Sequence, residues 1–181
     1  EAIKMGDLVA VFQEGGRVAQ FGTPTELLAS PASDFVARFV GADRGLKRLS
    51  LSRVRDIELQ PAVIGRLGEP AGNARRRALA DPLPYLLLVD DQERPVGWLR
   101  DVEIEGDGVL TEAMAIPMSP LLSAETTLKD ALSQMLDADV HTGIVVDRAG
   151  RVSGLITADS IGGFLRAQVG PETGTRDLAQ P

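Results

Sequence analysis

The strongest constraint on this fold is an internal repeat. A shift of 57 residues, which carries Asp90 onto Asp147, lays the second part of the chain over itself without a gap. The matches are Leu88-Val89-Asp90 with Val145-Val146-Asp147, Arg94 with Arg151, and Gly97-Trp98-Leu99 with Gly154-Leu155-Ile156. A repeat of this length predicts one small supersecondary unit built twice.

Each copy has the pattern helix, strand, turn, strand, helix, which predicts an α/β fold. In the second copy, Thr127 is expected to cap a helix, and strands are expected at 143–146 and 152–156 around a turn at 147–150. The apolar face of that helix would comprise Leu128, Ala131, Leu132, Met135 and Leu136, and that of the closing helix Ile161, Phe164 and Leu165. In the first copy, a helix is expected at 75–80, and glycines and Pro70 before it leave its start open. A unit of this size cannot cover both faces of its own small sheet. We therefore expect the two copies to pack against each other.

The N-terminal part predicts a hairpin over residues 7–21 and two short helices. Thr23, Pro24 and Glu26 form a capping-box pattern before the first helix, and the second is expected over 34–40, ending at Gly41. Residues 42–56 are charged and predict a linker. Residues 1–5 resemble the end of a helix, so we expect the sequence to be a piece of a longer protein.

Composition narrows the possible functions. A net charge of −7 and 4% aromatic residues argue against nucleic-acid binding, and the absence of cysteine excludes disulfides and thiolate metal sites. No apolar run approaches the roughly 20 residues of a membrane span, and no signal peptide is visible. No G-x-x-x-x-G-K-[ST] motif occurs, and the single histidine, His141, has no catalytic arrangement around it. We therefore expect neither catalysis nor a metal site in this chain.

The basic clusters have two interpretations: a solvated face, or a patch that binds anions or anionic lipid. They comprise Arg44, Lys47, Arg48, Arg53 and Arg55, and then Arg75, Arg76 and Arg77.

The strand-to-helix junction of the second repeat is the candidate binding site. A helix N-terminus beside the hydroxyls of Thr157 and Ser160 suits a phosphate, and Asp159 could accept hydrogen bonds from a ribose. The alternative is plain helix capping. In the first repeat, Arg100 could meet a phosphate and Glu103 a ribose. Beside the base of such a ligand we expect Ile144, Val145 and Val146.

The repeats resemble CBS domains, in which an apolar strand ending in Asp and a glycine turn precede G-h-h-T-x-x-D, where h is apolar. Gly154-Leu155-Ile156-Thr157 fits, but Ser160 replaces the final acid and Asp159 stands one residue early. Residues 1–46 resemble the segment that follows the switch histidine of an ABC ATPase. That resemblance rests on Glu1 to Asp7, Gly15-Gly16-Arg17, Gly22-Thr23-Pro24 and Phe39-Val40-Gly41.

Together these features resemble the ATP-binding subunits of osmoprotectant ABC importers for glycine betaine, carnitine or choline. The resemblance implies an ATPase remnant over 1–46, CBS repeats over 47–112 and 113–168, and a flexible tail over 169–181. ATP would bind in the missing ATPase part, and the CBS cleft would hold an adenine nucleotide such as cyclic di-AMP, AMP or ATP, or the module would sense ionic strength.

The implied partners are a second copy, held through the CBS repeats, and the membrane permease subunits. The second copy is expected to cover a flat apolar surface on the outer helices, which carry Leu132, Met135, Ile161 and Phe164. The implied location is cytoplasmic, peripheral on the inner face of the plasma membrane. The alternative function is a purely structural dimerisation module without a ligand.

Overall fold

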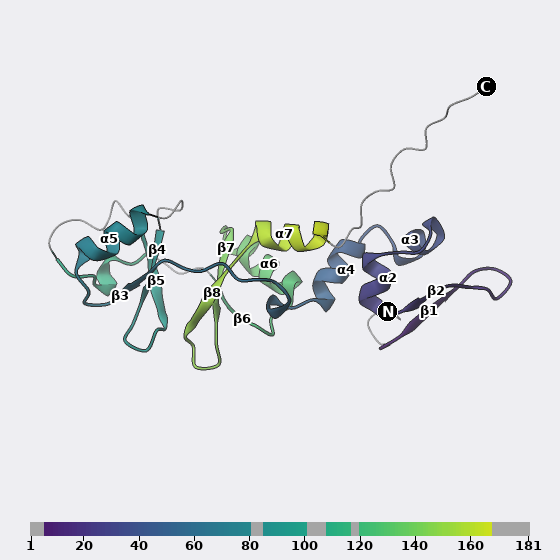
Figure 1. Ribbon diagram of the computed structural model, residues 1–181, viewed down its shortest axis with the longest axis horizontal. Coiled ribbons are helices and arrows are strands. Elements are labelled where there is room, and N and C mark those ends of the chain that lie inside the picture. The colour runs from purple at the N-terminus through teal and green to yellow at the C-terminus, as the bar shows by residue number, and fades with distance from the viewer. Residues whose placement is uncertain (1–5, 81–84, 101–107, 117–119, 168–181) are drawn as a thin grey trace, which may run out of the picture. The chain divides into compact units, whose positions relative to one another are not determined.

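The computed structural model describes residues 6–80, 85–100, 108–116 and 120–167 (Figure 1). It divides into a first unit, Glu1–Ser52 with Gly162–Pro181, and a second unit, Arg53–Ile161. Residues 1–5, where the sequence suggests the end of a helix, lie outside the described residues.

The first unit contains the predicted hairpin and helices. Strands β1 (Val9–Phe12) and β2 (Val18–Gly22) pair antiparallel, and the turn between them uses positive φ angles at Gly15 and Gly16. Helix α2 (Pro24–Ala29) has the predicted capping box between Thr23 and Glu26. Helix α3 (Asp34–Val40) ends at Gly41, whose φ is 89°. The core of this unit comprises Val11, Leu27, Leu28, Val36 and Val40.

Several aromatic side chains of the first unit are left exposed. The resemblance of residues 1–46 to an ATPase segment predicts that Phe12, Phe21, Phe35 and Phe39 are either partly exposed or covered by a substitute partner through dimer or swapped packing. In an ATPase, such a segment would bury them against the ATPase core. The exposed fractions of Phe12, Phe21 and Phe39 are 58%, 64% and 58%, and Phe35 is half-buried. The prediction is confirmed. An apolar surface of this kind is typical of a contact with another part of a protein.

The prediction of a linker over 42–56 is wrong. Helix α4 (Arg44–Leu51) and the 3-10 helix η1 (Val54–Asp56) occupy this stretch. The buried face of this stretch has helical spacing and comprises Arg48, Leu49 and Ser52. Because one of these residues is charged, the sequence does not show the apolar stripe that would predict a helix.

Arg48 is 3% exposed, so the interpretation of its cluster as a solvated face is wrong at this position. Its guanidinium donates to the carbonyl oxygens of Leu165 (3.1 Å) and Phe164 (3.5 Å) and lies 5.7 Å from the Phe164 ring centroid. Those carbonyls belong to the last turns of helix α7 (Ala158–Ala167), where a cation is stabilised by the helix dipole. Burial, and then the nearby charge of Arg44, lower the pKa of Arg48.

The second unit contains the two repeats as two similar three-stranded sheets. In the first, β3 (Ile64–Arg66) is parallel to β4 (Tyr85–Val89), which is antiparallel to β5 (Pro95–Arg100). In the second, β6 (Leu121–Ser123), β7 (Thr142–Val146) and β8 (Val152–Thr157) have the same order and directions. The α/β repeat prediction is confirmed.

The helices of the repeats are α5 (Ala71–Leu79) and α6 (Leu128–Asp137), with α7 closing the second repeat (Figure 1). As predicted, Thr127 caps α6. Helix α5 contains the expected stretch up to Leu79, and its start, which the sequence left open, is Ala71. Pro70 occupies the N-cap position, and the preceding turn takes its positive φ at Gly68. The apparent helix breakers are therefore the residues that start the helix.

Two expectations about the outer helix faces are wrong. Leu136, expected on the buried face of α6, is 66% exposed and lies in the last turn of the helix. Met135 and Ile161, expected on a surface that a second chain covers, are 0% and 1% exposed within this chain.

Two crossing segments tie the repeats together. Residues 53–60 precede β3, the first strand of the first repeat, but pair with the second repeat. Val54 donates to the Thr126 carbonyl at 2.9 Å, and Gln60 exchanges backbone hydrogen bonds with Leu155. Residues 108–116, which include the 3-10 helix η3 (Glu112–Met114), pair with the first repeat instead. There, Ile116 exchanges backbone hydrogen bonds with Trp98, at 3.2 and 2.9 Å.

Candidate functional site

The junction of β8 and α7 is closed by a reciprocal capping arrangement. Ser160 donates its backbone N–H to the Thr157 hydroxyl at 3.1 Å, and Thr157 donates its own N–H to the Ser160 hydroxyl at 3.1 Å. The Ser160 hydroxyl also donates to the Thr157 carbonyl at 2.8 Å. These bonds are what the capping alternative predicts. Both residues are only half-buried, so a ligand can still reach the helix N-terminus.

The other candidate site residues are scattered. Asp159 and Arg100 are exposed, and Glu103 lies outside the described residues. Ile144 and Val146 belong to an apolar cluster between the two repeats. Val145 is buried on the opposite face of β7, because neighbouring residues of a strand point to opposite sides of the sheet. His141 is exposed, and the described residues contain no cluster of metal-ligating side chains.

The two hairpin turns carry the same charged motif. Asp147 accepts hydrogen bonds from the Arg151 backbone N–H (2.9 Å) and Nε (2.8 Å), and Asp90 accepts the same bonds from Arg94, at 2.9 and 2.8 Å. Hydrogen bonds from the Arg94 and Arg151 backbones are the largest cause of the lowered pKa values of Asp90 and Asp147. Each pair therefore fixes a turn.

These turns predict a loss of stability in acid. Because the folded pKa values of Asp90 and Asp147 are lowered, the stability they contribute is present above their unfolded pKa, about 3.9, and is lost as the pH falls through the folded values. The double variant Asp90→Asn/Asp147→Asn should lack this component. Denaturant unfolding between pH 6 and pH 3 should show that the difference in the free energy of unfolding between the wild type and this variant shrinks toward zero. An advantage that stays constant over this range would contradict the assignment.

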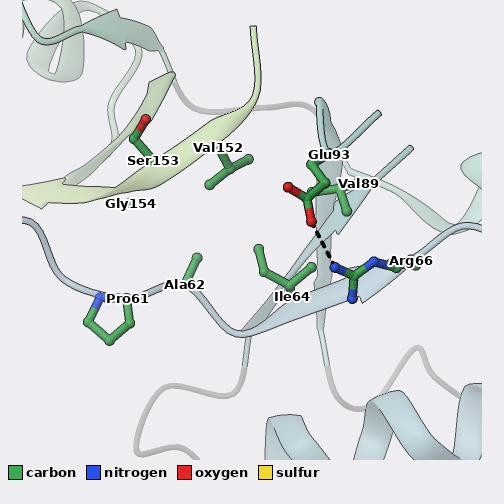
Figure 2. A pocket seen from close by; sticks show the side chains of 9 residues that line it. All are labelled: Pro61, Ala62, Ile64, Arg66, Val89, Glu93, Val152, Ser153 and Gly154. Atoms are coloured by element: carbon green, nitrogen blue, oxygen red, sulfur yellow. Dashed lines mark hydrogen bonds and ion pairs between the residues drawn. The ribbon is translucent and has the colours of Figure 1, made fainter. Parts of the chain in front are cut away.

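A cavity of about 170 Å³ lies within the second unit, where the two repeats meet (Figure 2). Its lining residues are Pro61, Ala62, Ile64, Arg66, Val89, Glu93, Val152, Ser153 and Gly154. The wall contains both apolar side chains and polar groups, and at its rim the Arg66 guanidinium and the Glu93 carboxylate form an ion pair of 2.9 Å. None of the site residues expected from the sequence lines this cavity.

Glu93 holds its place at the cavity with an uncommon backbone. Its φ is 61°, in the left-handed region, and the residue at the equivalent position of the second repeat is Gly150, with φ 79°. A glutamate here is less stable than glycine, and such outliers concentrate at functional sites. The repeat alignment carries this signal, since it sets Glu93 against Gly150 and Arg66 against Ser123. Neither Glu93 nor Arg66 is among the site residues that the matching positions of the two repeats predict.

Comparison with known proteins identifies the relatives of this chain. The family model of the CBS domain matches residues 114–164. The osmoprotectant import ATP-binding protein OsmV of Salmonella typhimurium is 33% identical over 166 residues, which are 91% of this chain and 43% of that protein. The choline transport ATP-binding protein OpuBA of Bacillus subtilis is 29% identical over 169 residues, 89% of this chain and 43% of that protein. The chain thus spans less than half the length of these relatives.

Solved structures share the fold. Staphylococcus aureus OpuCA matches with a TM-score of 0.51 and 18% identity, over 60% of this chain and 94% of that one. CBSX2, solved in complex with AMP, matches with a TM-score of 0.53 and 17% identity, over 64% of this chain and 97% of that one. Within the described residues, no helix is long and apolar enough to cross a bilayer. With its two CBS-like repeats, the chain is a homologue, over 91% of its own length, of the ATP-binding subunits of osmoprotectant ABC transporters.

Proposed function

We propose that this chain is the regulatory part of the ATP-binding subunit of an ABC importer for osmoprotectants such as glycine betaine. The observation that supports the proposal is the similarity to OsmV, which runs through both the hairpin unit and the repeats. ATP would bind in a part of the subunit outside this sequence, which has no phosphate-loop motif and would not be an enzyme by itself. The subunit would sit on the cytoplasmic face of the membrane, against the permease subunits.

The signal we propose is an adenine nucleotide, such as AMP, ATP or cyclic di-AMP, or a change in ionic strength. The N-terminus of α7, with the hydroxyls of Thr157 and Ser160, would take a phosphate, and Asp159 would meet a ribose. Arg100 and Glu103 would have these roles in the first repeat. The base would lie near the strand that contains Ile144, Val145 and Val146. AMP in the CBSX2 structure supports this ligand class.

Thr157→Val tests the phosphate site. Removing one hydroxyl bond to a charged phosphate should weaken nucleotide binding by about 1.5–3 kcal/mol, roughly tenfold to a hundredfold. Calorimetric titration of AMP, ATP and cyclic di-AMP into both proteins, at one salt concentration, measures the change.

Thr127→Val is the matched control, because Thr127 caps α6 by the same 3.1 Å bond to a backbone N–H. Equal affinities of wild type and Thr157→Val for a ligand that binds would remove Thr157 from the site. In the full-length subunit, the same ligand should change ATPase activity through this site.

A structural dimerisation module is the second candidate, and it has its own observation. Leu79 and Leu136 occupy equivalent places in the last turns of α5 and α6, and their side chains are 61% and 66% exposed. An exposed apolar position kept in both repeats would be covered if a second copy packed on these helices. We expect Leu79→Asp/Leu136→Asp to shift sedimentation at micromolar concentration from dimer to monomer. A wild-type monomer, or a variant dimer of unchanged strength, would contradict this interface.

A further inference from the structure

The cavity beside Arg66 and Glu93 is separate from the proposed phosphate site. Its lining includes the first residues of β8, Val152 to Gly154, whereas Thr157 ends the same strand. Three residue steps of extended strand, from Gly154 to Thr157, cover roughly 10 Å, so a ligand of the size of a small amino acid cannot occupy both places.

The walls and the rim of the cavity differ in chemistry. Ala62, Ile64 and Val152 present apolar side chains to the space, and the ion pair lies across the rim (Figure 2). The side chains of Arg66 and Glu93 are 56% and 57% exposed, and an ion pair so exposed contributes little to stability. Its partners can therefore separate at little cost when a ligand supplies a replacement for each charge.

The backbone keeps Glu93 over the cavity. Its carbonyl oxygen accepts a hydrogen bond from the Val152 N–H at 3.0 Å, which joins the hairpin turn of the first repeat to the start of β8. The second repeat has neither charge, since Gly150 and Ser123 stand at the equivalent positions. The strained glutamate and its arginine thus occur at only one of two related places, which a structural turn does not require.

We propose that this cavity binds a compact zwitterion, with its carboxylate on Arg66, its cationic group beside Glu93 and its apolar body against Ile64 and Val152. A ligand with only a negative charge would pair with Arg66 and leave the Glu93 carboxylate without a counter-charge. A ligand with only a positive charge would leave the Arg66 guanidinium without one. A zwitterion replaces the ion pair with two new ones. The volume of about 170 Å³ admits a molecule of the size of glycine betaine.

Glycine betaine is the probe, and two compounds of similar shape test its charges. In 3,3-dimethylbutanoate (tert-butylacetate, a carboxylate), a carbon replaces the cationic nitrogen of glycine betaine. Choline keeps the cationic group but lacks the carboxylate. Titrations followed by amide NMR, at constant ionic strength, should shift the signals of Ile64 and Val152, with a dissociation constant in the millimolar range. Glycine betaine should bind at least fivefold more tightly than either analogue.

Three variants separate the site from its surroundings. Arg66→Gln should weaken glycine betaine binding at least tenfold, and Glu93→Gln at least fivefold. Arg55→Gln is the matched control, because Arg55 is 54% exposed and pairs with Glu125 outside the cavity lining, so binding should not change.

Several results would overturn the proposal: no shifts at 100 mM glycine betaine, equal binding of tert-butylacetate, or tighter binding in Glu93→Gln, which would indicate an anion site. If the chain also has the proposed function, this binding would let the importer respond to the solute that it transports, and that further step rests on the proposed function. The titration tests the cavity alone, whereas nucleotide binding and ATPase activity test that function, so the two can fail separately.

Discussion

Leu87→Ala is expected to lower the free energy of unfolding by about 2–5 kcal/mol. Leu87 is 0% exposed and lies in the apolar cluster between the repeats, with Val89, Ile144 and Leu155. On the other face of β4, Leu86 and Leu88 pack in the core of the first repeat. Because both faces of the strand are buried, the truncation leaves a cavity that cannot collapse without moving a neighbouring repeat. Urea denaturation at pH 7 measures the loss.

Leu121→Ala serves as the control for this prediction. It makes the same truncation on a strand, but Leu121 is 47% exposed, so the loss should be well under half as large. A loss below about 1 kcal/mol in Leu87→Ala would show that the repeats do not pack through this cluster.

Gly97→Ala should cost about 2–4 kcal/mol, from overpacking and from two strained backbone hydrogen bonds. A Cβ at this position would lie 2.7 Å from the Ile116 carbonyl oxygen and 2.7 Å from the Ala115 Cβ. The backbone of the crossing segment cannot move aside without stretching the bonds between Ile116 and Trp98. Thermal unfolding should show a lower midpoint, and hydrogen exchange should show faster exchange at the Ile116 amide.

Gly72→Ala is the opposite case. Gly72 lies in α5, and a Cβ added there would meet no neighbouring atom within 4 Å, so alanine should stabilise the protein by about 0.5–1 kcal/mol. If both glycine variants were destabilised alike, a general effect of glycine replacement would explain the result and the crossing contact would not.

The sequence predicts an element well where the local signals in it agree. The second repeat combines a capping threonine, helical spacing and a glycine turn, and its helices and strands lie where these signals indicate. The α4 helix escaped prediction because Arg48 occupies a buried position on it, and its charge is stabilised by the end of α7, more than a hundred residues away in the sequence. No local pattern contains that contact.

The candidate site divides in the same way. The capping pair Thr157 and Ser160 is a local signal, and the structure contains it. The cavity is built from three separated stretches, around Ile64, Glu93 and Val152, which only the packing of the repeats brings together. What the sequence offered for the cavity was a mismatch, a glutamate where the sister repeat has glycine. Differences between repeats can therefore indicate function as well as similarities do.

The crossing segments determine how the chain can be cut. The stretch that matches the CBS family model, 114–164, lacks residues 53–60, which pair with its outer strand β8. Expressed alone, it would present that strand as an open sheet edge, and open edges recruit other chains. A continuous piece that keeps this pairing must begin before Arg53 and include both repeats. We therefore expect the two repeats to be retained, lost or moved to another protein only as a pair.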